Sequence, residues 1–273
     1  MDHERDPHLD LTQVAQGDLR LNMSRRQTLM FGGMAAAAAT VATMAPLDSR
    51  AAQAASQGKP IDIVFMLYPT FTLQDFAGAN EVFARLPEVT VRVATPDGGP
   101  VTSDTDITFA DSLKIGEVTS CDIICVSGGT NHKRAMMPDV QENLRRLAAQ
   151  ATYVTSICNG SLILGNAGLL KGKRSACWWG QRSLLKQYGA IPDPARVVID
   201  GRNMSGGGVT AGIDFALTVG AILRGEIAAQ VVQLTMEYAP DPPFKSGRVE
   251  TAPPEVIEAW KKRYPTLVAN AGL

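Results

Sequence analysis

Apolar and polar residues alternate along the chain in segments that predict strands and helices in turn. Residues 61–67, 89–94, 123–126 and 153–157 form short runs rich in Ile and Val, the pattern of buried strands. A further strand is predicted at 197–199, and the polar stretch 101–111 suggests an edge hairpin. Apolar residues at helical spacing predict helices over 73–86, 139–150, 159–168, 181–188, 213–223 and 253–264.

This alternation predicts the fold class and a single main domain. Strands that alternate with helices form a mostly parallel sheet covered by helices on both faces, the α/β class. The segment from residue 55 to residue 273 contains no internal repeat and no linker that would divide it. We therefore expect one α/β domain over residues 55–273.

The first 54 residues are interpreted as an export signal. Arg25 and Arg26 stand directly before a mildly apolar run, 29–46, and Ala52-Gln53-Ala54 forms a small-x-small cleavage pattern. A twin arginine, a weakly hydrophobic core and Arg50 near the cleavage pattern resemble a twin-arginine signal. The run is short and poor in Leu, Ile and Phe, which argues against a stable membrane anchor. The expected destination is the periplasm.

The charge balance of the remaining chain argues against nucleic-acid binding. Residues 1–54 hold five basic and six acidic side chains, and the remainder carries 21 of each. A nucleic-acid-binding protein usually has a clear basic excess that neutralises phosphates. A small neutral substrate fits this balance better than a polyanion.

Four cysteines occur in the predicted mature chain, and two of them are interpreted as core residues. Cys121 and Cys125 flank the apolar pair at 123–124. Four residues along a strand span roughly 13 Å, which exceeds the reach of a disulfide. Their spacing with no nearby histidine is poor evidence for a metal site, so none is predicted.

Cys158 is the candidate nucleophile. A predicted strand runs directly into this cysteine, and Asn159, Gly160 and Ser161 then open a helix. This is the strand–nucleophile–helix elbow known from hydrolases, with cysteine in the nucleophile's place. The helix N-terminus would stabilise a thiolate and lower the pKa of the thiol. The alternative is a buried structural cysteine.

Two other strand ends supply polar groups that could act beside Cys158. The strand at 123–126 ends in Ser127-Gly128-Gly129, and the Gly129 amide could bind a developing negative charge, although a tight turn explains it equally well. Asp75 lies just past the first strand, where it could be a general acid/base or a residue that complements a helix dipole. Ligands of open α/β sheets bind at the carboxyl ends of the strands, where all three segments meet.

These segments together resemble the ThiJ/PfpI superfamily, which has the flavodoxin-like fold of the class I glutamine amidotransferases. Two stretches near the C-terminus narrow the resemblance to the isocyanide hydratase branch. The motifs are Gln74-Asp75-Phe76-Ala77-Gly78, Ser127-Gly128-Gly129-Thr130, Ser156-Ile157-Cys158-Asn159-Gly160 and Gly165-Asn166-Ala167-Gly168-Leu169-Leu170, with the narrower pair at 209–217 and in Glu237-Tyr238 followed by Asp241-Pro242-Pro243-Phe244.

The resemblance implies a reaction and the residues that perform it. Cys158 would attack the carbon of an isocyanide, Asp75 would manage protons, and water would release an N-substituted formamide. The resemblance also implies backbone donors at Gly129 and Asn159, a homodimer and no cofactor. The chain departs from relatives at Asn159, where Thr or His is common, and at Trp178, which replaces a histidine.

Several alternatives accompany this interpretation. His132 could reach the pocket, although a solvated histidine at a helix start is the plainer explanation. Gly206-Gly207-Gly208-Val209-Thr210-Ala211 fits a dinucleotide fingerprint but comes late and lacks the acidic residue about twenty positions on, so we interpret it as a tight turn. Competing functions are a glyoxalase-like, deglycase or amidase activity, and a non-enzymatic thiol or ligand sensor.

Overall fold

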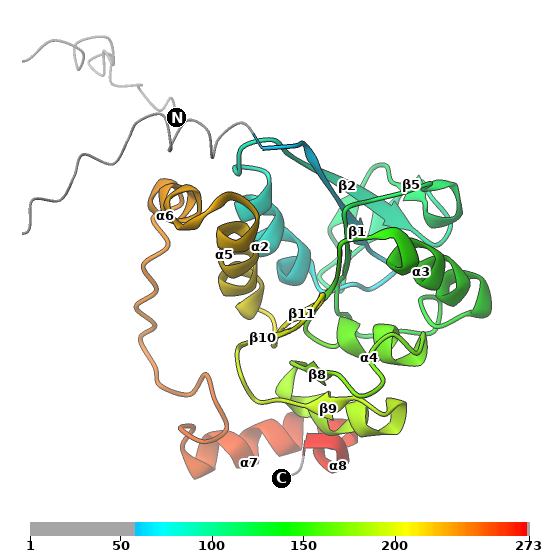
Figure 1. The fold of residues 1–273 in the computed structure, drawn as a ribbon. Helices are drawn as coiled ribbons and strands as arrows, with labels where there is room; N and C mark the ends of the chain where they lie inside the picture. Colours follow the sequence, from blue (N-terminus) through cyan, green and yellow to red (C-terminus); the bar gives the residue numbers. More distant parts are fainter. Residues whose placement is uncertain (1–57, 272–273) are drawn as a thin grey trace, which may run out of the picture. The chain divides into compact units, whose positions relative to one another are not determined.

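The computed structural model describes residues 58–271, all within one unit, Pro46–Leu273. The predicted export signal at 1–54 lies outside the described residues. Secondary structure begins at β1 (Ile61–Met66) and ends with α8 (Val268–Ala271) (Figure 1).

A seven-stranded sheet forms the centre of the described unit. Its strands follow the spatial order β10-β11-β7-β6-β1-β2-β5, and each neighbouring pair is parallel except β10–β11. The strands after β1 are β2 (Val89–Thr95), β5 (Leu113–Lys114), β6 (Ile123–Val126), β7 (Tyr153–Ile157), β10 (Val197–Asp200) and β11 (Asn203–Gly206). The predicted α/β fold with a mostly parallel sheet is confirmed.

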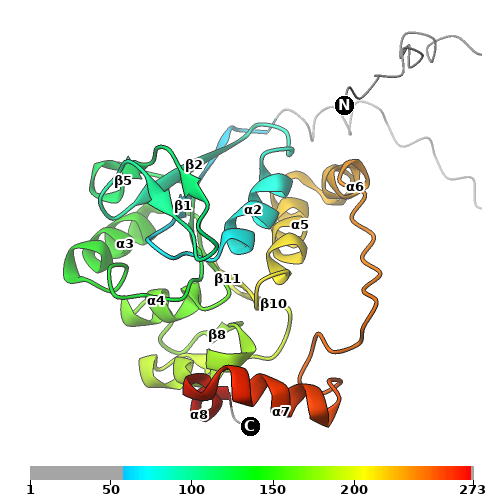
Figure 2. The ribbon, with the colours of Figure 1, turned by 180° about the vertical axis from the view of Figure 1, so that it is seen from behind.

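The alternation of side chains in β1 divides the core into two layers. Ile63 and Phe65 pack with one apolar cluster, whereas Val64 and Met66 pack with the other. Successive residues of a strand point to opposite faces, so both faces of the sheet need cover. Helices α2 (Leu73–Phe83), α5 (Ala211–Arg224) and α6 (Glu226–Thr235) lie on one side, and α3 (Pro138–Gln150) and α4 (Gly160–Asn166) on the other (Figures 1 and 2).

Shorter elements surround this sheet. A hairpin of β3 (Val101–Thr102) and β4 (Thr108–Phe109) lies where a hairpin is predicted, but it forms its own two-stranded sheet. Strands β8 (Arg174–Ser175) and β9 (Ile191–Pro192) form another pair, and α8 packs on the 3₁₀ segment η3 (Trp179–Tyr188). The remaining elements are η2 (Ile115–Glu117), α7 (Pro254–Arg263) and η4 (Pro265–Leu267).

The sequence pattern misses several elements of this fold, and β11 and α6 are among them. Strand β11 is fully buried between β10 and β7, although its residues Asn-Met-Ser-Gly lack a strand pattern. Only Gly225 separates α6 from α5, so the sequence contains no longer turn pattern that would predict a second helix. The helix predicted at 181–188 is the 3₁₀ segment η3. Pairing with neighbours, rather than local sequence, defines these segments.

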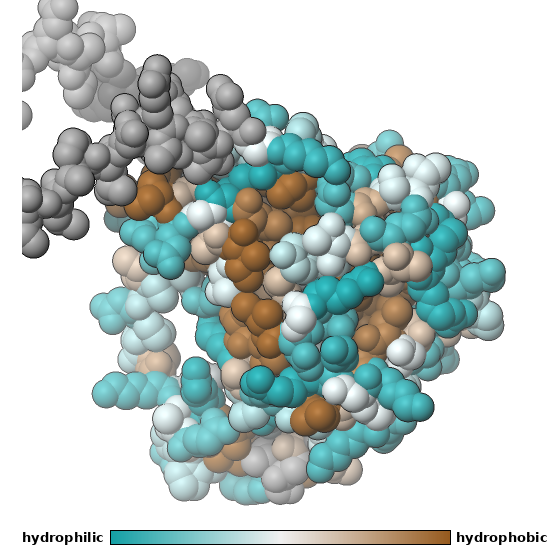
Figure 3. All heavy atoms as spheres, viewed as in Figure 1, coloured by the Kyte–Doolittle hydropathy of each residue, from teal (hydrophilic) through white to brown (hydrophobic). Residues whose placement is uncertain are grey.

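Apolar side chains reach the surface over α5 and α6 (Figure 3). Ile227, Val231 and Leu234 of α6 are exposed, and they recur at the spacing of one helix face. Ile222 of α5 is exposed as well. No helix within residues 58–271 combines the length and the apolar character that a membrane crossing requires.

Candidate active site

Cys158 lies at the sharp turn between β7 and α4. Its φ angle is 60°, a left-handed conformation that non-glycine residues rarely adopt. The Cys158 amide stabilises this turn because it donates to the carbonyls of Gly206 and Gly207, each at 3.0 Å. The close approach of α4 to β6 requires Gly160, since a Cβ there would overlap the Val126 carbonyl oxygen. The predicted elbow geometry is therefore present.

Asp75 lies in the first turn of α2 and is completely buried. Its Oδ2 accepts a hydrogen bond from the Gly128 amide at 3.0 Å. A Cβ on Gly128 would stand 2.5 Å from this Oδ2 and 2.7 Å from the Cβ of Cys158. The carboxyl group and the cysteine thus meet over a glycine that has no side chain to separate them.

Burial raises the pKa of both groups, and the charge of Asp75 raises the pKa of Cys158 further. Burial raises the pKa of Asp75 to about 8, although the adjacent Cys158 thiol and the Gly128 amide act in the opposite direction. The pKa of Cys158 lies well above its ordinary value because of burial and the neighbouring Asp75, while the Asn159 and Val209 amides lower it. The expectation that the helix N-terminus lowers the thiol pKa is wrong, because desolvation outweighs the amide dipoles.

The Gly129 amide is not open to a ligand. It donates to Oδ1 of Asn159 at 2.8 Å, and Nδ2 of Asn159 returns a bond to the Gly129 carbonyl at 3.0 Å. The amides directed at the sulfur are instead those of Asn159 and Val209. Of the two backbone donors expected from the sequence, Asn159 is near the sulfur and Gly129 is already bonded.

His132 differs from its predicted position. It is half-buried and precedes α3 by several residues, so it does not start a helix. Its Nε2 lies 3.0 Å from the Gly129 carbonyl oxygen, and its ring packs edge-on to Tyr68. Burial lowers the pKa of His132. The interpretation of a solvated histidine is therefore wrong, and His132 supports the loop that contains Gly129.

The remaining cysteines lie in the core. Cys121, Cys125 and Cys177 are buried and free, and burial raises the pKa of each thiol to about 12. Cys177 is close enough to Cys158 for its charge to raise the pKa of that thiol further. Among residues 58–271, no group of three or more His, Cys, Asp or Glu could hold a metal ion.

Three buried oxygens on the segments that meet at the elbow have no hydrogen-bond partner within the described chain. They are Oδ1 of Asp75, Oγ of Ser127 and the Tyr68 hydroxyl. Charges on Cys158 and Asp75 both raise the pKa of Tyr68, which shows that its hydroxyl lies in the same region. Buried polar atoms are normally satisfied, so unpaired atoms in this number are typical of a site that receives a polar molecule.

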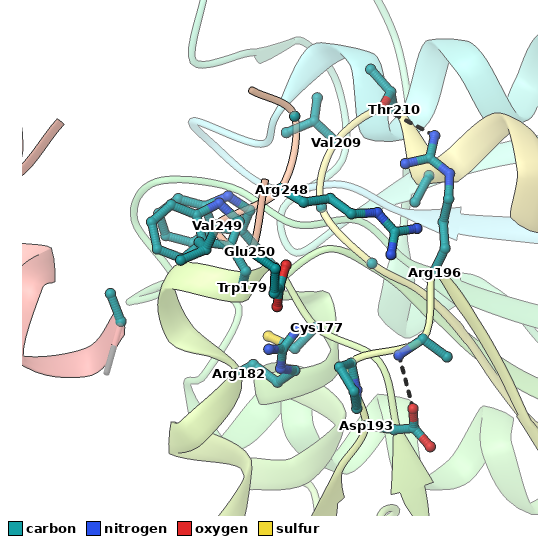
Figure 4. A pocket seen from close by; sticks show the side chains of 18 residues that line it. Cys177, Trp179, Arg182, Asp193, Arg196, Val209, Thr210, Arg248, Val249 and Glu250 are labelled. Carbon is teal, nitrogen blue, oxygen red and sulfur yellow. Dashed lines mark hydrogen bonds between the residues drawn. The ribbon is translucent and has the colours of Figure 1, made fainter. Parts of the chain in front are cut away.

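Residues 207–210 form the turn between β11 and α5, as expected for the glycine-rich motif. Trp178 packs against this turn, and a Cβ on Gly208 would overlap its indole ring. A cavity of about 850 Å³ lies beyond, between the turn, η3 and residues 247–250 (Figure 4). Cys158 does not line this cavity. Gly207 and Val209, however, line the cavity and also contact Cys158. Sequence reasoning misses the cavity because its walls come from segments that are distant along the chain.

An elbow cysteine beside a buried carboxyl group, at the carboxyl edge of a mostly parallel sheet, defines an α/β protein with a cysteine at the centre of its candidate site. The model of the DJ-1/PfpI family matches residues 62–221, and the chain belongs to that family. It is 46% identical over 205 residues to an isonitrile hydratase of Pseudomonas putida, which covers 74% of this chain and 90% of that protein.

Two further proteins are similar to this chain. A crystal structure of a ThiJ/PfpI family protein from Pseudomonas syringae superposes with a TM-score of 0.75 at 32% identity, covering 86% of this chain and all of that one. The HTH-type transcriptional regulator CdhR of Pseudomonas aeruginosa is 29% identical over 178 residues, which are 62% of this chain and 53% of the regulator.

Proposed function

We propose that the protein is a hydro-lyase that adds water to an isocyanide and releases an N-substituted formamide. One observation carries the proposal: the side chains of Cys158 and Asp75 are buried and both lie against Gly128. The 46% identity to an isonitrile hydratase supports the same reaction. Cys158 is the proposed nucleophile, and Asp75 is the proposed acid and base.

The first step forms a carbon–sulfur bond. The Cys158 sulfur attacks the terminal carbon of the isocyanide, and the one proton that the Cys158–Asp75 pair then holds moves to that carbon. The products are a thioimidate, R–N=CH–S–Cys158, and an Asp75 carboxylate. The Asn159 and Val209 amides stabilise the sulfur while it carries negative charge.

The second step uses water and restores the pair. Asp75 accepts a proton from water as its oxygen attacks the thioimidate carbon, and passes that proton to the nitrogen. When the carbon–sulfur bond breaks, the remaining water proton returns to the pair and the formamide R–NH–CHO leaves. The unpaired Oδ1 of Asp75 is suited to hold this water because it lacks a partner within the described chain.

Formamide production from an alkyl or aryl isocyanide tests this proposal. Cys158→Ala should lower kcat by at least about 10³-fold, because the covalent step is lost. Cys121→Ala is the matched control, since Cys121 is also buried but lies outside the site, and it should retain activity. Equal turnover by the wild type and Cys158→Ala would end the proposal.

Other cysteine reactions remain competing proposals and are separated by substrate profiling. Glyoxalase-like, deglycase or amidase turnover with no formamide from isocyanides would favour one of them. A thiol sensor has less support, because sensor cysteines are accessible and have a low pKa, whereas Cys158 is buried and its pKa is raised. Stoichiometric oxidation of Cys158 without turnover would favour a sensor.

We also propose export to the periplasm and assembly as a homodimer without a cofactor. Arg25-Arg26 and the following apolar run support export. The family resemblance and the exposed apolar face of α6 support the homodimer. Export is tested by cell fractionation of the wild type and an Arg25→Lys/Arg26→Lys variant. The dimer is tested by light scattering of the wild type and Leu234→Asp.

A further inference from the structure

The cavity beside the candidate active site has its own chemistry. It opens next to the turn at 207–210, whose carbonyl at Gly207 accepts from the Cys158 amide and whose Val209 amide faces the sulfur. Cys177 also lines the cavity, and its charge acts on Cys158, so the cavity wall adjoins the elbow. An isocyano group is linear and narrow, so a molecule held in the cavity could direct it toward the sulfur.

Tryptophans form one side of the cavity. Trp178 and Trp179 line it, with ring centroids 5.6 Å apart, and Trp260 packs on Trp179 at 4.6 Å. Apolar and aromatic walls bind the hydrocarbon part of small ligands, and a volume of about 850 Å³ suits a molecule of ring size or larger. These walls therefore favour a ligand with an aromatic or alkyl middle.

The charged side chains of the cavity separate into paired and unpaired groups. Asp193 is paired with Arg174 and also accepts from the Ala195 amide, and Arg196 is paired with Asp214. Neither Arg182 nor Arg248 has an ion-pair partner among residues 58–271, and Glu250 has none either. The lining thus holds three guanidinium groups against the carboxylates of Asp193 and Glu250, and the charge of Arg182 also lowers the pKa of Asp193.

The two arginines reach the cavity from different segments. Arg182 extends from η3 and is half-buried, whereas Arg248 extends from the chain that leads to α7 and is exposed. Figure 4 shows Arg182 near Cys177 and Arg248 extending toward Arg196. Guanidinium groups beside an apolar wall are the usual means of binding a carboxylate, which they can contact through two parallel hydrogen bonds.

We infer that the cavity binds the distal end of the substrate and selects isocyanides that carry a carboxylate. This inference rests on the proposed function. The apolar middle of such a molecule packs on Trp178 and Trp179, its carboxylate lies against Arg182 and Arg248, and its isocyano group faces Cys158. The sequence-based expectation of a neutral substrate follows from the charge of the whole mature chain, whereas this cavity has a local positive excess.

A matched pair of substrates tests the inference. 4-Isocyanobenzoate and 4-isocyanobenzamide have similar size and differ in charge. The wild type should turn over the benzoate with a kcat/KM about tenfold higher than that of the benzamide. An Arg182→Gln/Arg248→Gln variant should lose this preference, because its kcat/KM for the benzoate should fall about tenfold more than that for the benzamide. Arg145→Gln is the control, because Arg145 is an exposed arginine of α3 that does not line the cavity.

Binding of the products gives a second readout that needs no turnover. The three tryptophans of the chain all belong to the cavity wall and its backing, so tryptophan fluorescence reports on this site. 4-Formamidobenzoate should bind about tenfold more tightly than 4-formamidobenzamide to the wild type and equally to the double variant. If neither isocyanide is consumed, the proposed function fails, and this titration still decides the cavity. Equal binding of both compounds by the wild type, or a preference that survives in the double variant, overturns the inference.

Discussion

The side-chain amide of Asn159 pairs with both backbone groups of Gly129. Its Oδ1 accepts from the Gly129 amide at 2.8 Å, and its Nδ2 donates to the Gly129 carbonyl at 3.0 Å. The same Nδ2 lies 2.7 Å from Oε1 of Gln181. Asn159 therefore fastens the elbow after β7 to the loop after β6 and to η3.

Removal of this side chain should loosen all three segments. Asn159→Ala leaves the buried Gly129 amide without a partner, which should lower the free energy of unfolding by about 1–3 kcal/mol. Urea denaturation measures the change. Asn131→Ala is the control, because exposed Asn131 accepts only from the nearby Lys133 amide. An Asn159→Ala protein as stable as the control would contradict this role.

The raised pKa of Asp75 predicts how activity depends on pH. Below about pH 8 Asp75 is protonated, and Cys158 is a thiol because its pKa is higher still, so the pair holds two protons. The proposed attack needs the form with one proton, which appears as the pH rises toward about 8. We expect kcat/KM for an isocyanide to increase up to tenfold per pH unit below that value and then to level off.

Asp75→Asn provides the control for this pH profile. Asparagine does not titrate, so the low residual kcat/KM of the variant should not show the rise toward pH 8. A wild-type kcat/KM that is constant or decreasing between pH 6 and pH 8 would contradict the proposed protonation states.

Asp75 should also control the reactivity of Cys158 toward alkylating reagents. Its negative charge raises the pKa of the thiol, so Asp75→Asn should lower that pKa and increase the thiolate fraction above pH 8. We expect iodoacetamide to modify Cys158 faster in the variant than in the wild type, although the variant should retain only a low residual kcat/KM for isocyanides. Mass spectrometry of the peptide that contains Cys158 measures the rate. Slower modification of the variant would show that Asp75 does not oppose the thiolate.

Gly208 should be required for the position of Trp178. A Cβ at this glycine would overlap the indole, so Gly208→Ala must displace the ring at a cost of about 1–3 kcal/mol in stability. The tryptophan emission spectrum should change because the Trp178 ring moves. Gly116→Ala is the control, because the nearest atom to a Cβ there is 3.7 Å away. Identical emission spectra and free energies of unfolding for Gly208→Ala and the wild type would show that the Trp178 ring accommodates the added methyl group without loss of stability.

The sequence predicts the strands of the sheet centre closely, because buried parallel strands have a plain pattern. The bounds of β6 and β7 match the apolar runs at 123–126 and 153–157, and Cys158 follows directly at the elbow. The meeting of Asp75 with the Cys158 elbow follows from the same logic, since parallel strands end at a common edge. These predictions depend on local sequence and on one general rule of topology.

The features that the sequence does not predict depend on the packed environment. The direction of the pKa shift at Cys158 is set by burial, which the motif at the elbow does not reveal. The Gly129 amide is bonded because Asn159 turns back toward it, a contact across 30 positions of the chain. The cavity between η3 and residues 247–250 likewise exists only in three dimensions.

The elbow geometry has a consequence for how the protein folds. The groups that surround Cys158 come from the ends of β1, β6, β7 and β11, and the stretch from Asp75 to Val209 covers more than half of the described residues. Contacts of such high sequence separation close only after the intervening chain is ordered. No partly assembled sheet holds the complete site, so the proposed isocyanide-hydrating activity should appear during refolding only when the native structure is complete.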